Sequence, residues 1–338
     1  MVIEAAPRDA AVLTFAAAAS WTTSVATSLV PSFVAPSVAS FAVPFVAPFV
    51  ASLAALTALF IGLAPIAAMA APEQLLTQSY TQAWMRASAA RYGPPQQAEL
   101  AATEALFVRL LEGQNPAALH DLARSGGWEL RTQTRAGGTV VVVTELAPRG
   151  RGRGLYAFFG EGRHALQAPH VPTDQLTGDI LRRYADDALP RAMAWNTVPR
   201  SVADLAHLEA TDMIAFSMAF ARVHPQERLI QLHGFDSASR KTAVAQASAA
   251  IVSAGHPEPS AELKDAVRCL KLKVEQSTRL YGDDVQELGG TTNAIGRALR
   301  TVGYVHFVHL ELNRSLRERL LRDTGQRRLL FTCLGGQS

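Results

Sequence analysis

Three short segments of the 338-residue chain hold the side chains best suited to chemistry. The first contains His170 and Asp174, the second contains His233, and the third contains Glu311. Imidazole and carboxylate groups are zinc ligands, and a catalytic zinc site combines them with an open coordination position and a carboxylate that handles protons. These residues therefore predict a site for one catalytic zinc ion.

The expected metal ligands are His170, Asp174 and His233. An imidazole and a carboxylate four residues apart reach one cation if the loop between them curls, although Asp174 is equally suited to cap a helix that begins at Gln175. His233 ends an apolar strand-like run and precedes Gly234, which permits close backbone approach. The alternative for His233 is a structural histidine at a strand end.

Glu311 is the candidate general base and acid. It shares one face of a predicted strand with Val305, Phe307 and His309. A carboxylate on a buried face is costly unless it is paired, bound to metal or catalytic. The alternative is an ion pair with a nearby arginine, Arg314 or Arg317.

Further polar residues near predicted strand ends are candidates for binding substrate. An arginine can hold a substrate carboxylate through two parallel hydrogen bonds. A Gly-rich loop at 288–293 offers free N–H groups to an anion, while Asp204 beside one candidate has the alternative role of a helix cap. The candidate substrate-binding residues are Asn196, Arg200, His207, Asn293, Arg297 and Arg314.

The pattern of the chain after residue 72 predicts an α/β fold. Two helices within 73–124, broken at 92–95, and a β-hairpin form an N-terminal extension to a mixed, mainly parallel central sheet flanked by helices. In such sheets, sites lie beyond the carboxyl ends of strands, where His170, Asn196 and His233 fall. The expected strands are 128–134, 139–146, 155–159, 165–168, 191–196, 228–232, 278–281 and 304–312, and the later helices are 175–188, 204–220, 261–276, 292–302 and one from 316.

The N-terminal segment has a different composition. Residues 10–72 contain no charged side chain, and a mostly apolar run at 50–64 is followed by the small residues of 68–72. This favours a signal peptide cut near Ala70 or Ala71 and an exported protein. The alternative is an uncleaved anchor over 50–69, long enough to span ~30 Å of hydrocarbon. The expected divisions are 1–71, 72–150 for the helices and hairpin, and 151–338 for a metallohydrolase domain.

Charge and cysteine content exclude other classes. The formal net charge of +3 is dispersed, without the basic stripe and interleaved aromatics that indicate nucleic acid as a partner. Cys269 and Cys333 are the only cysteines, so a multi-cysteine zinc site is excluded. In an exported protein they could pair as a disulfide, and otherwise they are two free buried thiols.

The order of these motifs resembles the zinc carboxypeptidase-like superfamily. Over about residues 155–325, the chain is most similar to the N-formylglutamate amidohydrolase and poly-γ-glutamate hydrolase type. The resemblance rests on Pro-His at 169–170, Leu-His-Gly-Phe at 232–235, Gly-Gly-Thr-Thr-Asn at 289–293 and His-Leu-Glu-Leu-Asn-Arg-Ser-Leu-Arg at 309–317. It implies that His170, Asp174 and His233 hold the zinc and that Glu311 activates water.

Two features depart from the carboxypeptidase pattern. The acidic ligand is Asp rather than Glu and follows the histidine by four residues rather than three. No aromatic residue clearly matches the one that closes over a peptide's C-terminus, Tyr281 and Tyr304 being candidates.

The expected activity is zinc-dependent cleavage of an amide in a small-molecule or peptide substrate with a carboxylate. The alternatives are a non-catalytic binding protein for an acidic ligand and a zinc esterase or deacylase.

Overall fold

The computed structural model describes residues 74–87, 91–135, 138–146, 150–171, 173–188 and 190–335. They belong to a compact unit that spans Ile66–Ser338. The predicted signal segment, and with it the choice between cleavage and anchoring, lies outside the described residues. Within the described ranges, no helix is both long enough and apolar enough to cross a membrane.

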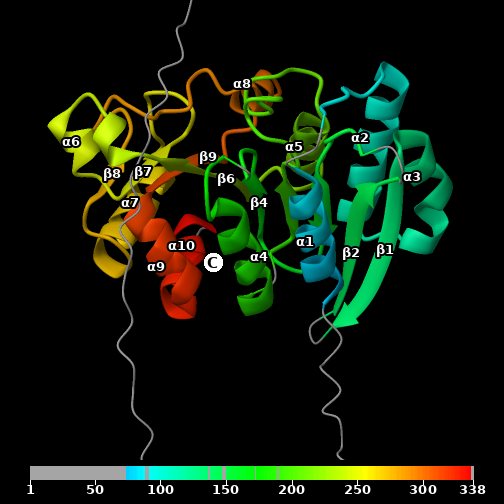
Figure 1. Cartoon of the computed structure of the whole chain (residues 1–338). Helices are drawn as coiled ribbons and strands as arrows, with labels where there is room; N and C mark the ends of the chain where they lie inside the picture. The colour runs from blue at the N-terminus through cyan, green and yellow to red at the C-terminus, as the bar shows by residue number, and fades with distance from the viewer. Residues whose placement is uncertain are drawn as a thin grey trace, which may run out of the picture. The chain divides into compact units, whose positions relative to one another are not determined.

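A nine-stranded mixed sheet forms the centre of the molecule, in the order β1-β2-β3-β5-β4-β6-β9-β7-β8 (Figure 1). The α/β fold class predicted from the sequence is therefore confirmed. The strands are β1 (Trp128–Arg135), β2 (Gly138–Glu145), β3 (Leu155–Phe158), β4 (His164–Ala168), β5 (Ala192–Trp195), β6 (Arg228–Phe235), β7 (Ala250–Ser253), β8 (Thr278–Leu280) and β9 (Phe307–Asn313).

The middle of the sheet is parallel. Strands β5, β4, β6 and β9 are neighbours that run in the same direction, whereas β3 and β7 flank them in the opposite direction. The register pairs Gln231 of β6 with His309 of β9, and His233 with Glu311. Because residues paired in register project to the same face, these four side chains lie together near the carboxyl ends of the two strands.

Helices cover both faces of this sheet (Figure 1). One hydrophobic core lies under α1, α4, α7, α9 and α10, and a second lies under α2, α3, α5 and α8. The helices are α1 (Leu75–Ala87), α2 (Gln97–Leu111), α3 (His120–Gly126), α4 (Thr177–Asp187), α5 (Asp212–Val223), α6 (Ala243–Gln246), α7 (Ala261–Lys273), α8 (Ala294–Thr301), α9 (Arg314–Arg322) and α10 (Thr324–Gly335), with 3-10 turns η1 (Pro116–Leu119) and η2 (Ser237–Ser239).

The two faces of the central strands differ in chemistry. On the face towards the first core, alternate residues of β6 and β9 stay apolar to the strand ends, as with Leu232 and Leu312. On the opposite face, Leu229 and Phe307 are apolar, but the positions that follow them are Gln231 and His309, both buried. One face of the sheet therefore changes from apolar to polar towards its carboxyl edge.

Two helix starts differ from the sequence-based expectations. The helix predicted from residue 204 begins at Asp212, because Ala210 has a positive φ of 52° and the Thr211 hydroxyl accepts from the Ile214 N–H at 3.3 Å. Asp204 is therefore not its cap. Helix α4 begins after Leu176 without a side-chain cap, so the capping role considered for Asp174 is also wrong.

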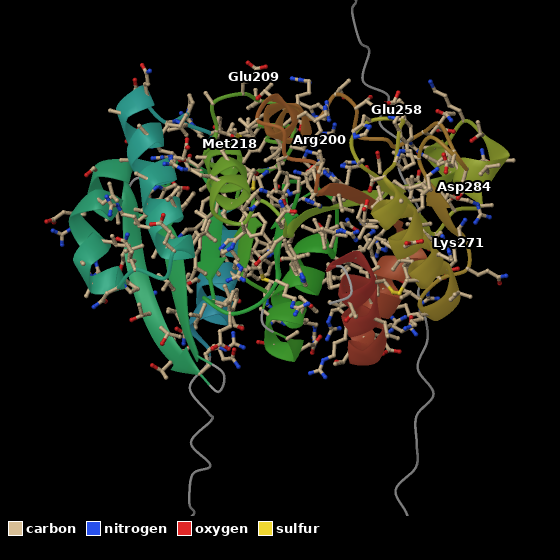
Figure 2. The ribbon with its side chains drawn as sticks, turned by 180° about the vertical axis from the view of Figure 1, so that it is seen from behind. Arg200, Glu209, Met218, Glu258, Lys271 and Asp284 are labelled. Carbon is tan, nitrogen blue, oxygen red and sulfur yellow. A yellow bond between two sulfur atoms is a disulfide. The ribbon has the colours of Figure 1, made fainter. Side chains whose placement is uncertain are left out.

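Cys269 of α7 and Cys333 of α10 form a disulfide, with their Cα atoms 5.6 Å apart (Figure 2). Both helices pack on the same face of the sheet. The bond joins residues 64 positions apart and ties the C-terminal helix to the layer that supports β7 and β8. The alternative of two free thiols does not hold in this structure.

We expect reduction of this disulfide to lower the free energy of unfolding by about 4 kcal/mol, because the cross-link restricts a long loop of the unfolded chain. Denaturant unfolding of the oxidised and the reduced protein measures the difference. The Cys269→Ser/Cys333→Ser double variant is the control, since reductant should not change its midpoint. Equal midpoints for oxidised and reduced wild type would contradict the prediction.

Candidate metal centre

The loop after β4 curls back on itself. His170 lies two positions beyond the last residue of the strand, and its carbonyl accepts from the backbone N–H groups of Thr173 at 2.8 Å and Asp174 at 2.7 Å. This turn brings the side chains of His170 and Asp174 onto the same side of the loop. The Nδ1 atom of His170 lies 3.4 Å from Oδ2 of Asp174.

His233 completes a triangle of ligand atoms. Its Nδ1 lies 3.2 Å from Nδ1 of His170 and 3.3 Å from Oδ2 of Asp174. Tetrahedral zinc with bonds of ~2.0–2.1 Å places its ligand atoms about 3.3–3.4 Å apart. The three separations match this spacing, and the structure thus brings His170, Asp174 and His233 together as a possible metal-binding group.

The hydrogen bond on the far side of His170 leaves its Nδ1 available to a metal. Nε2 of His170 lies 2.8 Å from Oδ1 of Asp204, and a carboxylate in such a contact only accepts, so Nε2 carries the proton. A carboxylate behind a metal-binding histidine orients the ring and increases its basicity. Asp204 has this position, with side-chain exposure of 28%.

The charges at the site favour a cation. Burial alone would raise the pKa of Asp174, but the adjacent imidazoles of His170 and His233 outweigh it and hold that pKa well below its usual range. Burial alone would lower the pKa of His170, yet Asp174 and then Asp204 raise it. The pKa of His233 falls to about 4, first through burial and then through His309. Asp174 and Asp204 thus place two carboxylates around His170, and a divalent ion bound beside Asp174 would offset their charge.

Glu311 lies beside this triangle on β9, in register with His233. Its Oε1 is 3.3 Å from Nε2 of His309, and the residue is buried. The predicted alternative of an ion pair with arginine is not found: Arg314 pairs with Glu318 at 2.7 Å, and the Arg317 guanidinium donates to backbone carbonyls. Within the described residues, Glu311 therefore contacts His309 and has no arginine partner, and it lies on the strand next to His233.

Arg317 holds the walls of the site together. It donates to the carbonyls of Gln175 at 2.5 Å, Asn313 at 3.3 Å and Phe235 at 3.4 Å. Gln175 belongs to the loop between β4 and α4 that carries His170 and Asp174 (the metal loop), and the other two residues end β9 and β6. A Cβ at Gly234 would lie 2.3 Å from its guanidinium, so glycine is needed there to admit Arg317. The Gly234 N–H also donates to Oδ2 of Asp174 at 3.1 Å.

Arg200 and His207 form the rim on one side of the triangle. Nε of Arg200 donates to Oδ2 of Asp204 at 2.8 Å, and Nδ1 of His207 lies 2.9 Å from Oδ1 of the same carboxylate. The side chain of Arg200 is 46% exposed, and Figure 2 shows it at the same edge of the molecule as Glu209. Arg200 and His207 thus both contact Asp204, the same carboxylate that contacts His170.

The other substrate-binding candidates divide into two groups. Arg297 and Arg314 are exposed; Arg297 donates to the Thr292 carbonyl and pairs with Glu209 at 3.5 Å, whereas Arg314 also donates to Gln175. Asn293 is buried: its Oδ1 caps α8 by accepting from Gly296, and its Nδ2 donates to Gln231. The Asn293 N–H donates to the Gly290 carbonyl at 3.0 Å, so the chain itself uses an N–H of the expected anion loop.

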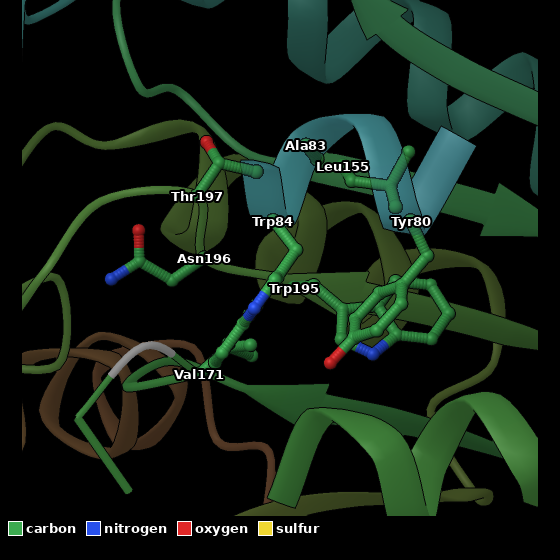
Figure 3. Close-up of a pocket in the computed structure, with 8 residues that line it drawn as sticks. All are labelled: Tyr80, Ala83, Trp84, Leu155, Val171, Trp195, Asn196 and Thr197. Atoms are coloured by element: carbon green, nitrogen blue, oxygen red, sulfur yellow. The ribbon is translucent and has the colours of Figure 1, made fainter. Parts of the chain in front are cut away.

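Asn196 has a supporting position. Its Nδ2 donates to the carbonyls of Pro169 and Val198 at 2.7 and 2.9 Å, and its Oδ1 accepts from the Val198 N–H. Figure 3 shows its amide pointing away from the rings of Tyr80 and Trp195, which line a small apolar pocket behind the metal loop. Asn196 therefore holds the backbone that carries His170.

Neither tyrosine considered as an aromatic arm is placed as one. Tyr304 is buried and donates to the carbonyl of Glu227, at the start of β6 and far from the carboxyl edge. Tyr281 packs against Gly289, where a Cβ would lie 2.3 Å from its ring. The described part of the site thus relies on charged and polar side chains at its rim.

Three residues that the sequence reasoning missed take part in the site: Asp204, Gln231 and His309. The sequence suggests only the alternative role of a helix cap for Asp204, because its contact partner His170 lies 34 positions earlier in the chain. Gln231 and His309 precede His233 and Glu311 by two positions, so strand alternation places them on the same face. That spacing was the signal available in the sequence.

Comparisons with known proteins add little to this picture. No protein-family model matches the chain, and no curated protein matches it. Solved structures with some likeness include zinc-free YndL (12% identity, TM-score 0.33, 67% of this chain and 93% of that one) and the LapA aminopeptidase of Legionella pneumophila (8%, 0.36, 78% and 71%). A third is a Shewanella amazonensis protein assigned as a metallopeptidase (9%, 0.34, 70% and 95%). At these values the likenesses establish neither family nor function.

We expect the purified protein to bind one equivalent of zinc, and His170→Ala and His233→Ala each to weaken binding by more than the ~10–100-fold that loss of an outer partner costs. Competition with a chromophoric chelator measures the dissociation constants. His120→Ala changes an exposed histidine on α3 and serves as the matched control. A wild type without zinc affinity, or ligand variants with unchanged affinity, would contradict the assignment.

Proposed function

We propose that this protein is an exported zinc-dependent hydrolase that cleaves an amide bond, as an amidohydrolase or peptidase. The observation that carries the proposal is the triangle of His170, Asp174 and His233 at separations of 3.2–3.4 Å, with the carboxylate of Glu311 on the adjacent strand. The resemblance to the N-formylglutamate amidohydrolase and poly-γ-glutamate hydrolase type agrees with this set of residues.

The residues of the chain divide the work of hydrolysis. Zinc, when bound, polarises a substrate carbonyl and lowers the pKa of water towards ~7. Glu311 accepts the proton of the attacking water and returns it to the leaving amine. Because no arginine neutralises Glu311 in the described structure, its carboxylate is available as a base, and His309 holds it in place beside His233.

A carboxylate on the substrate would meet the basic rim. Arg200 uses Nε to bind Asp204, and its terminal nitrogens extend from a half-exposed side chain towards solvent. His207 and Arg297 lie on the same side, linked to neighbouring positions through Thr292. We assign the substrate class as a small molecule or peptide with a carboxylate, held first by Arg200.

Export has its own support in the disulfide between Cys269 and Cys333. Disulfides persist in oxidising compartments and are rare in the cytosol. The charge-free segment of residues 10–72 agrees with a leader that directs the protein there.

We expect the exported form to begin near Ala71 or Pro72, because the apolar run ends in small residues typical of a cleavage site. Mass spectrometry of the N-terminal peptide from the exported fraction measures this. Peptides from residues 10–60 in that fraction would contradict cleavage.

The same metal centre would serve an esterase or deacylase, and a non-catalytic binding protein would use the basic rim alone. Comparing the turnover of a peptide, an ester and an N-acetylated alkylamine separates the first two from the proposal. Ligand binding that does not respond to a chelator, without turnover of any of the three, would favour the binding protein.

The role of Glu311 is tested by Glu311→Gln, which keeps the size of the side chain but removes its basicity. We expect normal folding and unchanged zinc affinity, with kcat lower by ~10²–10⁴, the usual contribution of a general acid and base. Steady-state kinetics on zinc-loaded protein gives the value. Glu129→Gln on β1, far from the site, is the control, and wild-type turnover in Glu311→Gln would remove Glu311 from the mechanism.

A further inference from the structure

A chain of buried polar side chains runs from helix α5 to His233 across the middle of the sheet. Gln167 of β4, Gln231 of β6 and Ser217 of α5 are almost fully buried. Burying amide groups is costly unless each one is hydrogen-bonded, so their connections must satisfy both the donors and the acceptors. In this chain of side chains, only one assignment of donors and acceptors satisfies every hydrogen bond.

The direction is set first at helix α5. The Ser217 hydroxyl donates to the Met213 carbonyl at 2.7 Å, which leaves the Ser217 oxygen as an acceptor for Nε2 of Gln167 at 2.6 Å. The Gln167 Oε1 then accepts from Nε2 of Gln231 at 3.0 Å. Because the Met213 carbonyl cannot donate, the Gln231 amide must turn its oxygen towards His233.

The second anchor lies at helix α8 and gives the same result. The Gly296 N–H donates to Oδ1 of Asn293 at 3.1 Å, so the other end of the Asn293 side chain, Nδ2, is a donor. Nδ2 lies 2.6 Å from Oε1 of Gln231. Two backbone groups of fixed polarity, one acceptor and one donor, thus force the same orientation on Gln231.

The fixed orientation of Gln231 determines the hydrogen bond of His233, whose Nε2 lies 2.9 Å from Oε1 of Gln231. We propose that Gln231 is a positioning residue that holds His233 in the tautomer with the proton on Nε2, so that the Nδ1 lone pair points at His170 and Asp174. Gln167, Ser217 and Asn293 act through Gln231. The inference rests on the proposed metal centre and explains how the buried histidine is prepared for it.

A neutral amide suits this position better than a carboxylate would. His170 has Asp204 behind it, and that carboxylate reaches solvent and is paired with Arg200. The partner of His233 lies in the middle of the sheet, where an unpaired charge is far more costly than a hydrogen-bonded amide. Gln231 supplies a fixed acceptor without adding a third carboxylate to the site.

The direct test is the tautomer of His233 in wild-type apo-protein. Long-range ¹H–¹⁵N correlation spectra of protein labelled at histidine distinguish a proton on Nε2 from one on Nδ1, with His233→Ala providing the assignment. We expect the Nε2–H form at neutral pH. Observation of the Nδ1–H form would overturn the inference, and this measurement requires no zinc.

Variants at residue 231 measure the effect on the metal. Gln231→Met keeps the length of the side chain but removes the acceptor, so we expect a mixture of tautomers and a ~10–100-fold weaker zinc affinity. Gln231→Glu restores an acceptor and should restore the Nε2–H form. An unchanged tautomer and unchanged zinc dissociation constant in Gln231→Met would overturn the proposal.

A matched control separates positioning from stability. Tyr304→Phe removes a buried hydrogen bond to the Glu227 carbonyl, in the second core but at the opposite end of β6 from the site. It should lower the unfolding temperature without moving the His233 tautomer or the zinc affinity. If wild type has the Nε2–H form but binds no zinc, the proposed function fails while the role of Gln231 stands.

Discussion

The parallel register of β4, β6 and β9 is the constraint on which the site depends. It places the ends of the three strands at one edge, with His170 just past β4, His233 on β6 and Glu311 opposite it on β9. A shift of either strand by one residue would turn His233 or Glu311 to the other face of the sheet, towards the core that contains Leu232 and Leu312. Strand pairing thus determines which side chains meet at the candidate site as well as the fold.

The charged and polar groups around the triangle of His170, Asp174 and His233 follow from the need to balance charge in a buried site. Buried carboxylates are stable only with compensating charge or hydrogen bonds. Asp174 accepts a hydrogen bond from the Gly234 N–H and lies next to the imidazoles of His170 and His233. Arg317 packs against Gly234 and donates to backbone carbonyls. The arrangement leaves a place for a cation between the imidazoles and the carboxylate. It also keeps Arg317 from neutralising Glu311 through a direct pair.

The N-terminal elements support the site from a distance. Arg153 is buried and binds both carboxylate oxygens of Asp212, the first residue of α5, at 2.7 and 2.6 Å. It also donates to the Gly126 carbonyl at the end of α3 and lies over the Trp128 ring at 4.7 Å. Removing one partner of such a buried pair costs about 3–5 kcal/mol. Helix α5, which carries Ser217 and Met213, is thereby fixed to α3 and β1.

The sequence by itself determined the α/β class, most strand positions and the candidate residues His170, Asp174, His233 and Glu311, because alternation and strand-end histidines are local signals. It did not determine the start of α5, since the positive φ of Ala210 and the cap at Thr211 override the apparent helical pattern from residue 204. Nor did it determine that Asp204 lies behind His170 or that Gln231 connects His233 to Ser217 and Asn293. The contacts that link these residues, including the one through Gln167, join positions 34 to 64 residues apart. They exist only when the sheet register and the helix packing bring their polar atoms within hydrogen-bonding distance.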